Sequence, residues 1–197
     1  MKTLDIYKFS ELNEQAKQKA LDWWKENREP NFDADAILEG IKEDLESMGM
    51  EEIDVRYSGF WSQGDGLSFT GDVYDTSGFL ISVTPWVEKH LNGLSTEVLE
   101  QLYDSLQICF ERNTSRYVHE KSVDTNLSAE WLTSDTFNII PKLEVAIDQW
   151  RIEKCKEFYD RLSNYYDECS SDESVKMYLE EQERELWSED GTFLKFS

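Results

Sequence analysis

The chain has few cysteines, prolines and glycines, and each shortage excludes a class of structure. Its three cysteines, Cys109, Cys155 and Cys169, are an odd number without paired spacing, so neither a disulfide framework nor a thiolate metal site is expected. Three prolines and nine glycines in 197 residues favour long regular elements over a loop-rich sandwich. Reduced thiols favour a location in the cytoplasm.

Long apolar runs are also missing. The opening residues, MKTLDIYKFSELNEQ, contain no apolar stretch of the kind that a secretory signal needs. No run approaches the roughly 20 apolar residues of a membrane-spanning helix. We therefore expect a soluble protein that is neither exported nor inserted in a membrane.

Positive charge is scarce, with 20 basic residues against 42 acidic ones and a net charge of −22. Such a surface repels nucleic-acid phosphates and anionic lipids, so direct binding to DNA, RNA or a membrane is disfavoured. It would attract a protein with a basic surface. The other interpretation, that the charge serves only solubility, stays open.

The apolar pattern predicts several helices and strands. Helices are expected after Ser10, a candidate N-cap, and over 34–48 before Gly49. Two alternating segments, 53–57 and 67–74, predict antiparallel strands joined by a glycine-rich hairpin connection. Later elements are expected as a helix over 95–110, a strand over 116–123, a helix over 141–166, and a last helix capped by Ser170 with Glu173.

This order of elements predicts an α+β fold in which several helices cover a small antiparallel sheet of about three strands. A single domain over residues 1–197 is expected, with residues 141–190 as a helical C-terminal part packed on it.

The sequence contains no motif that would place catalytic or metal-binding groups next to one another. The histidines, His90 and His119, share no motif spacing. Asp65, Asp72 and Asp75 lack the alternating ligands of a calcium loop. No nucleophile motif and no phosphate-binding lysine motif is present. We therefore expect no enzyme, and no catalytic residue, metal or cofactor.

The most unusual composition lies in residues 58–69, where two aromatic residues adjoin a polar, glycine-rich turn. An exposed aromatic side chain on a rigid hairpin is typical of binding hot spots. Alternatively, Phe60 and Trp61 plug the end of the core, and His119 is an ordinary structural histidine. The candidate binding residues are Phe60, Trp61, Gln63, Asp65, Tyr117 and His119.

The stretch YSGFWSQGDGLSFTG, residues 57–71, resembles the signature of a family of phage and prophage proteins of unknown function. Some members are labelled "antitoxin of toxin–antitoxin system". Leu67 stands where the family commonly has a small residue. The resemblance implies a phage accessory protein in the host cytoplasm, and neutralising a host defence or toxin protein is a common role for such proteins. Weaker resemblances cover residues 9–20, 117–120, 171–175 and 189–191.

Two functions follow as hypotheses. The first is an antitoxin-like or counter-defence inhibitor that docks on a host protein with a basic surface, in one version by acidic mimicry of nucleic acid. The alternative is a nucleotide-binding module or sponge that stacks its ligand on Trp61 or Tyr117. Its positive charge would come from Arg56, Arg112, Arg116 and Lys121. The sequence leaves the oligomeric state open.

Overall fold

The computed structural model describes residues 5–90, 105–129, 138–182 and 185–194. The chain forms two compact units, one of residues 34–161 and one of residues 1–33 together with 162–197. The expectation of a single domain over 1–197, with 141–190 packed on it, stays a prediction.

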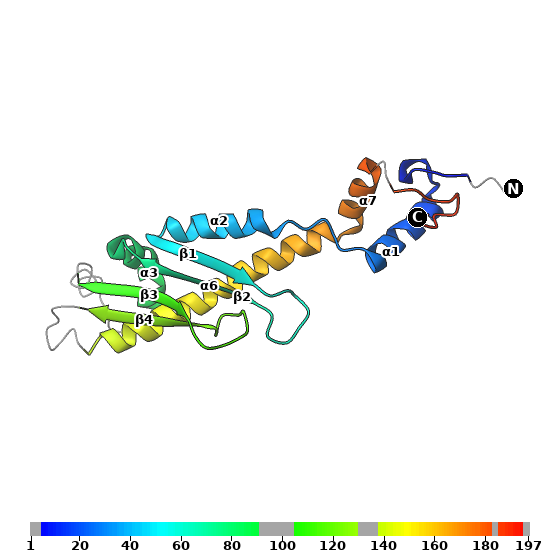
Figure 1. Ribbon diagram of the computed structural model, residues 1–197. Helices are drawn as coiled ribbons and strands as arrows, with labels where there is room; N and C mark the ends of the chain where they lie inside the picture. Colours follow the sequence, from blue (N-terminus) through cyan, green and yellow to red (C-terminus); the bar gives the residue numbers. More distant parts are fainter. Residues whose placement is uncertain (1–4, 91–104, 130–137, 183–184, 195–197) are drawn as a thin grey trace. The chain divides into compact units, whose positions relative to one another are not determined.

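The unit of residues 34–161 is built on a four-stranded antiparallel sheet (Figure 1). The strands follow one another in chain order across the sheet. They are β1 (Met50–Tyr57), β2 (Leu67–Val73), β3 (Leu106–Arg112) and β4 (Val123–Ala129). The predicted α+β fold is confirmed, and the sheet has four strands where about three were expected.

One face of this sheet carries the core of the unit. Because side chains alternate between the two faces of a strand, Leu67, Phe69 and Val73 of β2 are buried while the residues between Phe69 and Val73 on the other face are half-buried. The ring of Phe69 lies 5.8 Å from that of Phe110 on β3, centroid to centroid. A helix, α6 (Ile140–Cys169), supplies further aromatic rings to this face.

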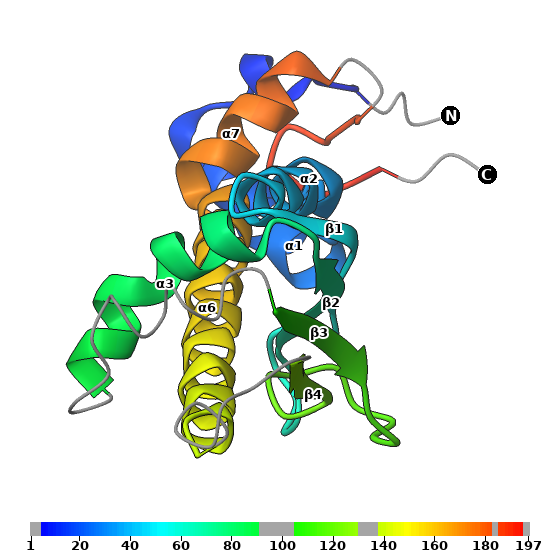
Figure 2. The same cartoon turned by 90° about the vertical axis from the view of Figure 1, so that its left-hand side faces the viewer.

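Three helices cover the inner face of the sheet. In α6, Trp150 meets Phe79 of α3 (Thr76–His90) edge to face at 5.1 Å. An ion pair of 2.9 Å joins Arg161 of α6 to α2 (Ala34–Glu46). Figure 2 shows α2, α3 and α6 on the same side of the sheet. The opposite side, called the outer face here, carries none of the described helices of this unit.

Three sequence predictions for this unit need correction. Residues 106–110 belong to strand β3 instead of a helix, while residues 95–104 of that predicted helix lie outside the described residues. The predicted strand over 116–123 is mostly the loop before β4, which begins at Val123. Helix α3 was not predicted at all, and Pro85 lies inside it.

In the described part of the other unit, an apolar cluster joins helices α1 (Glu14–Asn27) and α7 (Asp172–Glu181). α1 is capped by Asn13, whose side chain accepts a hydrogen bond from the Ala16 N–H at 3.0 Å. The predicted cap, Ser10, lies instead in a short 3-10 helix. α7 is capped by Ser171, one residue after the predicted Ser170.

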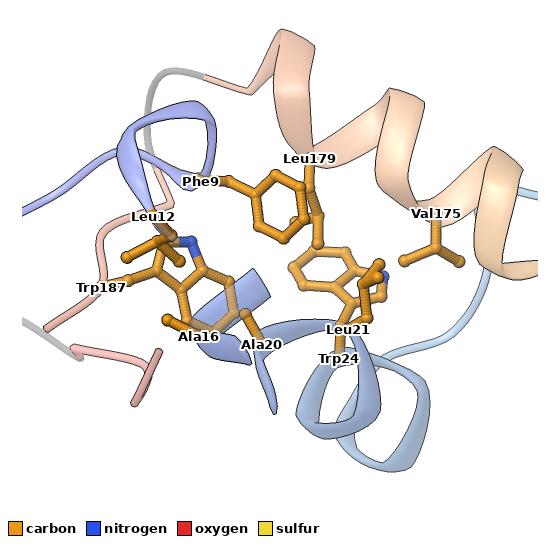
Figure 3. Close-up of a cluster of buried hydrophobic side chains, with 9 residues drawn as sticks. All are labelled: Phe9, Leu12, Ala16, Ala20, Leu21, Trp24, Val175, Leu179 and Trp187. Carbon is orange, nitrogen blue, oxygen red and sulfur yellow. The ribbon is translucent and has the colours of Figure 1, made fainter. Parts of the chain in front are cut away.

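The core of this unit is a single buried cluster (Figure 3). Trp187 is fully buried in it and pairs with Tyr7 through two backbone hydrogen bonds of 2.9 Å. This pairing fastens the C-terminal segment beside the N-terminal one. The cluster consists of Phe9, Leu12, Ala16, Ala20, Leu21, Trp24, Val175, Leu179 and Trp187.

Candidate functional site

The loop between β1 and β2, residues 58–66, is held in one conformation by hydrogen bonds within itself. The Ser58 N–H donates to the Gly66 carbonyl at 3.1 Å and closes the hairpin. One carboxylate oxygen of Asp65 accepts from the backbone N–H groups of Trp61 (2.9 Å) and Ser62 (2.6 Å). Charged acceptors make the stronger hydrogen bonds, so Asp65 fixes the tip of the loop.

Phe60 and Trp61 have opposite surroundings although they are neighbours. The ring of Phe60 is partly buried between Tyr57 (5.8 Å between centroids) and Tyr159 of α6 (5.7 Å). The Tyr159 hydroxyl also donates to the Gly59 carbonyl at 2.8 Å. Burial raises the pKa of Tyr159, and the charges of nearby carboxylates add to this. Trp61, in contrast, is 78% exposed. The core-plug interpretation therefore describes Phe60, and the exposed-aromatic interpretation describes Trp61.

The loop between β3 and β4, residues 113–122, packs directly against the first loop. The Ser58 hydroxyl donates to the Val118 carbonyl at 2.9 Å. Gly66 approaches His119 so closely that a Cβ at this position would lie 2.8 Å from the Cβ of His119. The structure thus brings the candidate residues of both loops together, with Tyr117 and His119 in a loop instead of the predicted strand.

His119 is a structural histidine. Its ring Nδ1 accepts a hydrogen bond from the Lys121 N–H at 3.0 Å. Its backbone N–H donates to the Ser122 hydroxyl (3.3 Å), which in turn donates to the His119 carbonyl (2.7 Å). The ring stacks on Tyr117 at 6.1 Å. His119 supports Tyr117, and Tyr117 itself is 48% exposed.

Among the exposed side chains of the two loops, we group Trp61, Gln63 and Tyr117 as the aromatic loop surface. The remaining candidate residues, Phe60, Asp65 and His119, hold this surface in place. It offers an indole, a phenol and a carboxamide, which suit contact with a partner. None of these three groups is a nucleophile or general base near neutral pH.

Buried Arg151 of α6 supports the second loop, and the sequence analysis missed it. Its side chain is almost fully buried and pairs with Asp148 at 2.7 Å. It also donates to the Glu120 carbonyl at 2.6 Å and to the Thr125 hydroxyl at 3.2 Å. The sequence signal was an Asp–Arg spacing of three on a predicted helix, which does not reveal burial.

Two of the four residues proposed to supply positive charge to a nucleotide, Arg56 and Arg116, have contacts with neighbouring side chains. The Arg116 guanidinium lies 5.2 Å from the centre of the Tyr117 ring and donates to its hydroxyl at 3.2 Å. Arg56 pairs with Asp54 at 2.6 Å. Burial lowers the pKa of Arg112, and the charge of Arg56 acts in the same direction. One nitrogen of Arg112, Nη2, is buried without a hydrogen-bond partner in the described part of the chain.

The described residues contain no candidate metal site and no candidate membrane-spanning helix. No three or more His, Cys, Asp or Glu side chains gather there in a way that could hold a metal ion. None of the described helices combines the length and apolarity needed to cross a membrane.

The fold and the two loops define an α+β protein that exposes Trp61 and Tyr117 in two loops at one end of an antiparallel sheet. Residues 23–172 match the model of a family described as a domain of unknown function (DUF8835), and the chain belongs to this family. No curated protein and no solved structure matches the chain. The resemblance of residues 57–71 to phage and prophage proteins stays a prediction.

Proposed function

We propose that this is a binding protein that docks its aromatic loop surface on a host protein with a basic surface and so inhibits it, in an antitoxin-like or counter-defence role. The observation that carries the proposal is the 78% exposure of Trp61 on a loop that Asp65 holds rigid. Removing an indole from water is favourable, and tryptophan is enriched among the residues that dominate binding energy.

The rigidity of the loop matters because ordering a flexible loop on binding opposes association. Hydrogen bonds from Trp61 and Ser62 to Asp65 already fix the tip of the loop. The close contact between Gly66 and His119 fixes its base against the neighbouring loop. A partner therefore meets a surface whose shape is set before contact.

The charge of the chain supports a basic partner. A net charge of −22 attracts a positively charged protein over a distance of about 10 Å at moderate salt and raises the association rate. Mimicry of nucleic acid is one version of the proposal, in which carboxylates occupy a basic channel. B-DNA carries about one charge per 1.7 Å, which sets the density that such a mimic must approach.

A protein partner is favoured over a nucleotide for two reasons. Phosphates need local positive charge, but the charge of Arg56 is already paired with that of Asp54 at 2.6 Å. The strongly negative net charge also opposes the approach of an anion.

The test is capture from a lysate of the host cells on immobilised full-length protein, comparing wild type with Trp61→Ala. Val145→Ala is the matched control, because Val145 is an apolar α6 residue that is 62% exposed. We expect one basic protein, identified by mass spectrometry, to be retained by wild type and control and reduced by about tenfold or more by Trp61→Ala. Equal retention by all three proteins, or no stoichiometric partner at low and physiological salt, would contradict the proposal.

A further inference from the structure

The outer face of the sheet holds two pairs of like charges at directly opposed positions. Glu51 of β1 lies opposite Asp72 of β2, and Glu111 of β3 lies opposite Asp124 of β4. Directly opposed residues share a face, with Cβ atoms about 4.5–5.5 Å apart, and like charges in this arrangement are destabilising. The outer face of the sheet, which no described helix of the same unit covers, thus carries two repulsive pairs.

These four carboxylates have no cationic partner within the described residues. No lysine or arginine nitrogen described there lies within 4.0 Å of them. Glu111 accepts a hydrogen bond from the Asn126 amide at 2.9 Å, and Asp124 accepts one from Asn113 at 3.0 Å. Neutral amides satisfy these oxygens without cancelling their charge.

Cys109 of β3 and Tyr74, which directly follows β2, both respond to this negative field. The pKa of the Cys109 thiol is raised to about 12, first by burial and then by the adjacent carboxylates of Asp72 and Glu111. The pKa of the Tyr74 phenol is also raised, first by the charge of Glu52, then by slight burial and by the charges of Asp72 and Glu51.

The same face is hollowed. A cavity of about 800 Å³ lies over β2, β3 and β4 beside the start of α3, and its walls include Asp72, Cys109 and Asn126. Tyr74, 61% exposed, stands at its edge. The hollow is at the α3 end of the sheet, whereas the aromatic loop surface is formed by loops at the other end (Figure 1).

We infer that the outer face of the sheet is a docking site for a lysine- and arginine-rich segment of a partner protein. Cationic side chains would relieve both like-charge pairs, and the exposed Tyr74 ring adds a cation–π contact. Nucleic acids and anionic lipids are repelled by this face. The inference does not depend on Trp61, because the two surfaces use different residues.

The test is titration of the full-length protein with a short oligolysine peptide at low and physiological salt, comparing wild type with Glu51→Gln/Glu111→Gln. The matched control is Glu39→Gln/Glu43→Gln, which removes the same charge from two exposed α2 residues of the same unit. We expect the sheet variant to lose about tenfold or more in affinity and the control to lose about twofold or less. Equal losses would overturn the inference, because net charge alone would then explain binding. Absence of binding by wild type at low salt would overturn it as well.

A second readout separates a lost site from a damaged fold. Because the repulsion is relieved, Glu51→Gln/Glu111→Gln should raise the urea concentration at the unfolding midpoint while it weakens peptide binding. Gln keeps a carbonyl oxygen that can accept from Asn126. A fall in both stability and affinity would contradict the inference. So would displacement of the peptide by spermidine at equal total ligand charge, since the face would then hold any polycation.

Discussion

Asp65 holds Trp61 by a hydrogen bond from the Trp61 backbone N–H to its carboxylate at 2.9 Å. The most exposed of the large apolar side chains in the described residues is therefore fixed by an acid inside its own loop. In an acidic protein this carboxylate has a structural role, since it orders the residue that we propose as the anchor for the partner.

Replacing Asp65 with Ala should loosen the tip of this loop. The amides of Trp61 and Ser62 lose their acceptor, so their hydrogen exchange should become faster, and the free energy of unfolding should fall by about 1–2 kcal/mol. Asp65→Asn keeps an oxygen acceptor and should have a smaller effect on both. Unchanged exchange at these two amides in Asp65→Ala would show that the loop is held by other contacts.

Glycine-to-alanine changes at Gly66 and Gly40 should have opposite effects on the stability of the fold. At Gly66 the new Cβ would lie 2.8 Å from His119 Cβ and 3.0 Å from its Cα, so the loops must separate and stability should fall by about 1–3 kcal/mol. At Gly40, inside α2, the new Cβ would meet only the flexible end of Arg161, so a gain of up to about 1 kcal/mol is expected. Urea denaturation of both variants checks this, and a shift of the same sign in both would contradict it.

Arg151→Leu should be strongly destabilising. The substitution leaves Asp148, the Thr125 hydroxyl and the Glu120 carbonyl without their buried cationic donor, at a cost of about 3 kcal/mol. Lys156→Leu, at an exposed position of the same helix, should change stability by about 0.5 kcal/mol or less. If the two variants unfold at the same urea concentration, the network around Arg151 contributes no net stability.

Alkaline pH should destabilise the protein through Cys155. Burial is the largest cause of a rise in the pKa of this thiol, from 9.0 to about 11. Because the folded pKa lies above the unfolded value, the stabilisation is complete below about pH 9 and is lost as pH rises towards 11. Wild type should therefore lose more stability than Cys155→Ala between neutral pH and pH values near 10.5. Parallel losses in the two proteins would contradict this assignment.

The sequence correctly predicted elements whose apolar residues follow either the helical period or the strand period, but not both. The helix over 34–48 and the antiparallel hairpin of β1 and β2 are confirmed. The pattern at β3 fits two periods, because Leu106, Cys109 and Phe110 suit a helix while Leu106, Ile108 and Phe110 suit a strand. The sheet pairing that decided between them is not visible in local sequence.

Only part of the candidate site was predicted, because local sequence does not reveal tertiary contacts. Unusual composition identified the loop with Trp61, but it did not separate this residue from its buried neighbour Phe60. The opposition of Glu51 to Asp72 depends on strand register, including the irregularity between Glu51 and Asp54. The burial of Arg151 depends on tertiary packing. Neither the opposition of Glu51 to Asp72 nor the burial of Arg151 can be predicted from the spacing of residues along the chain.

Cross-linking in host cells tests the central claim, that the aromatic loop surface docks on a basic protein. A photoreactive amino acid replaces exposed Gln63, and in a second protein it replaces exposed Val145. The account predicts one cross-linked basic protein from position 63, its loss when Trp61→Ala is added, and none from position 145. Absence of a cross-link at position 63, or the same product at both positions, would contradict the account.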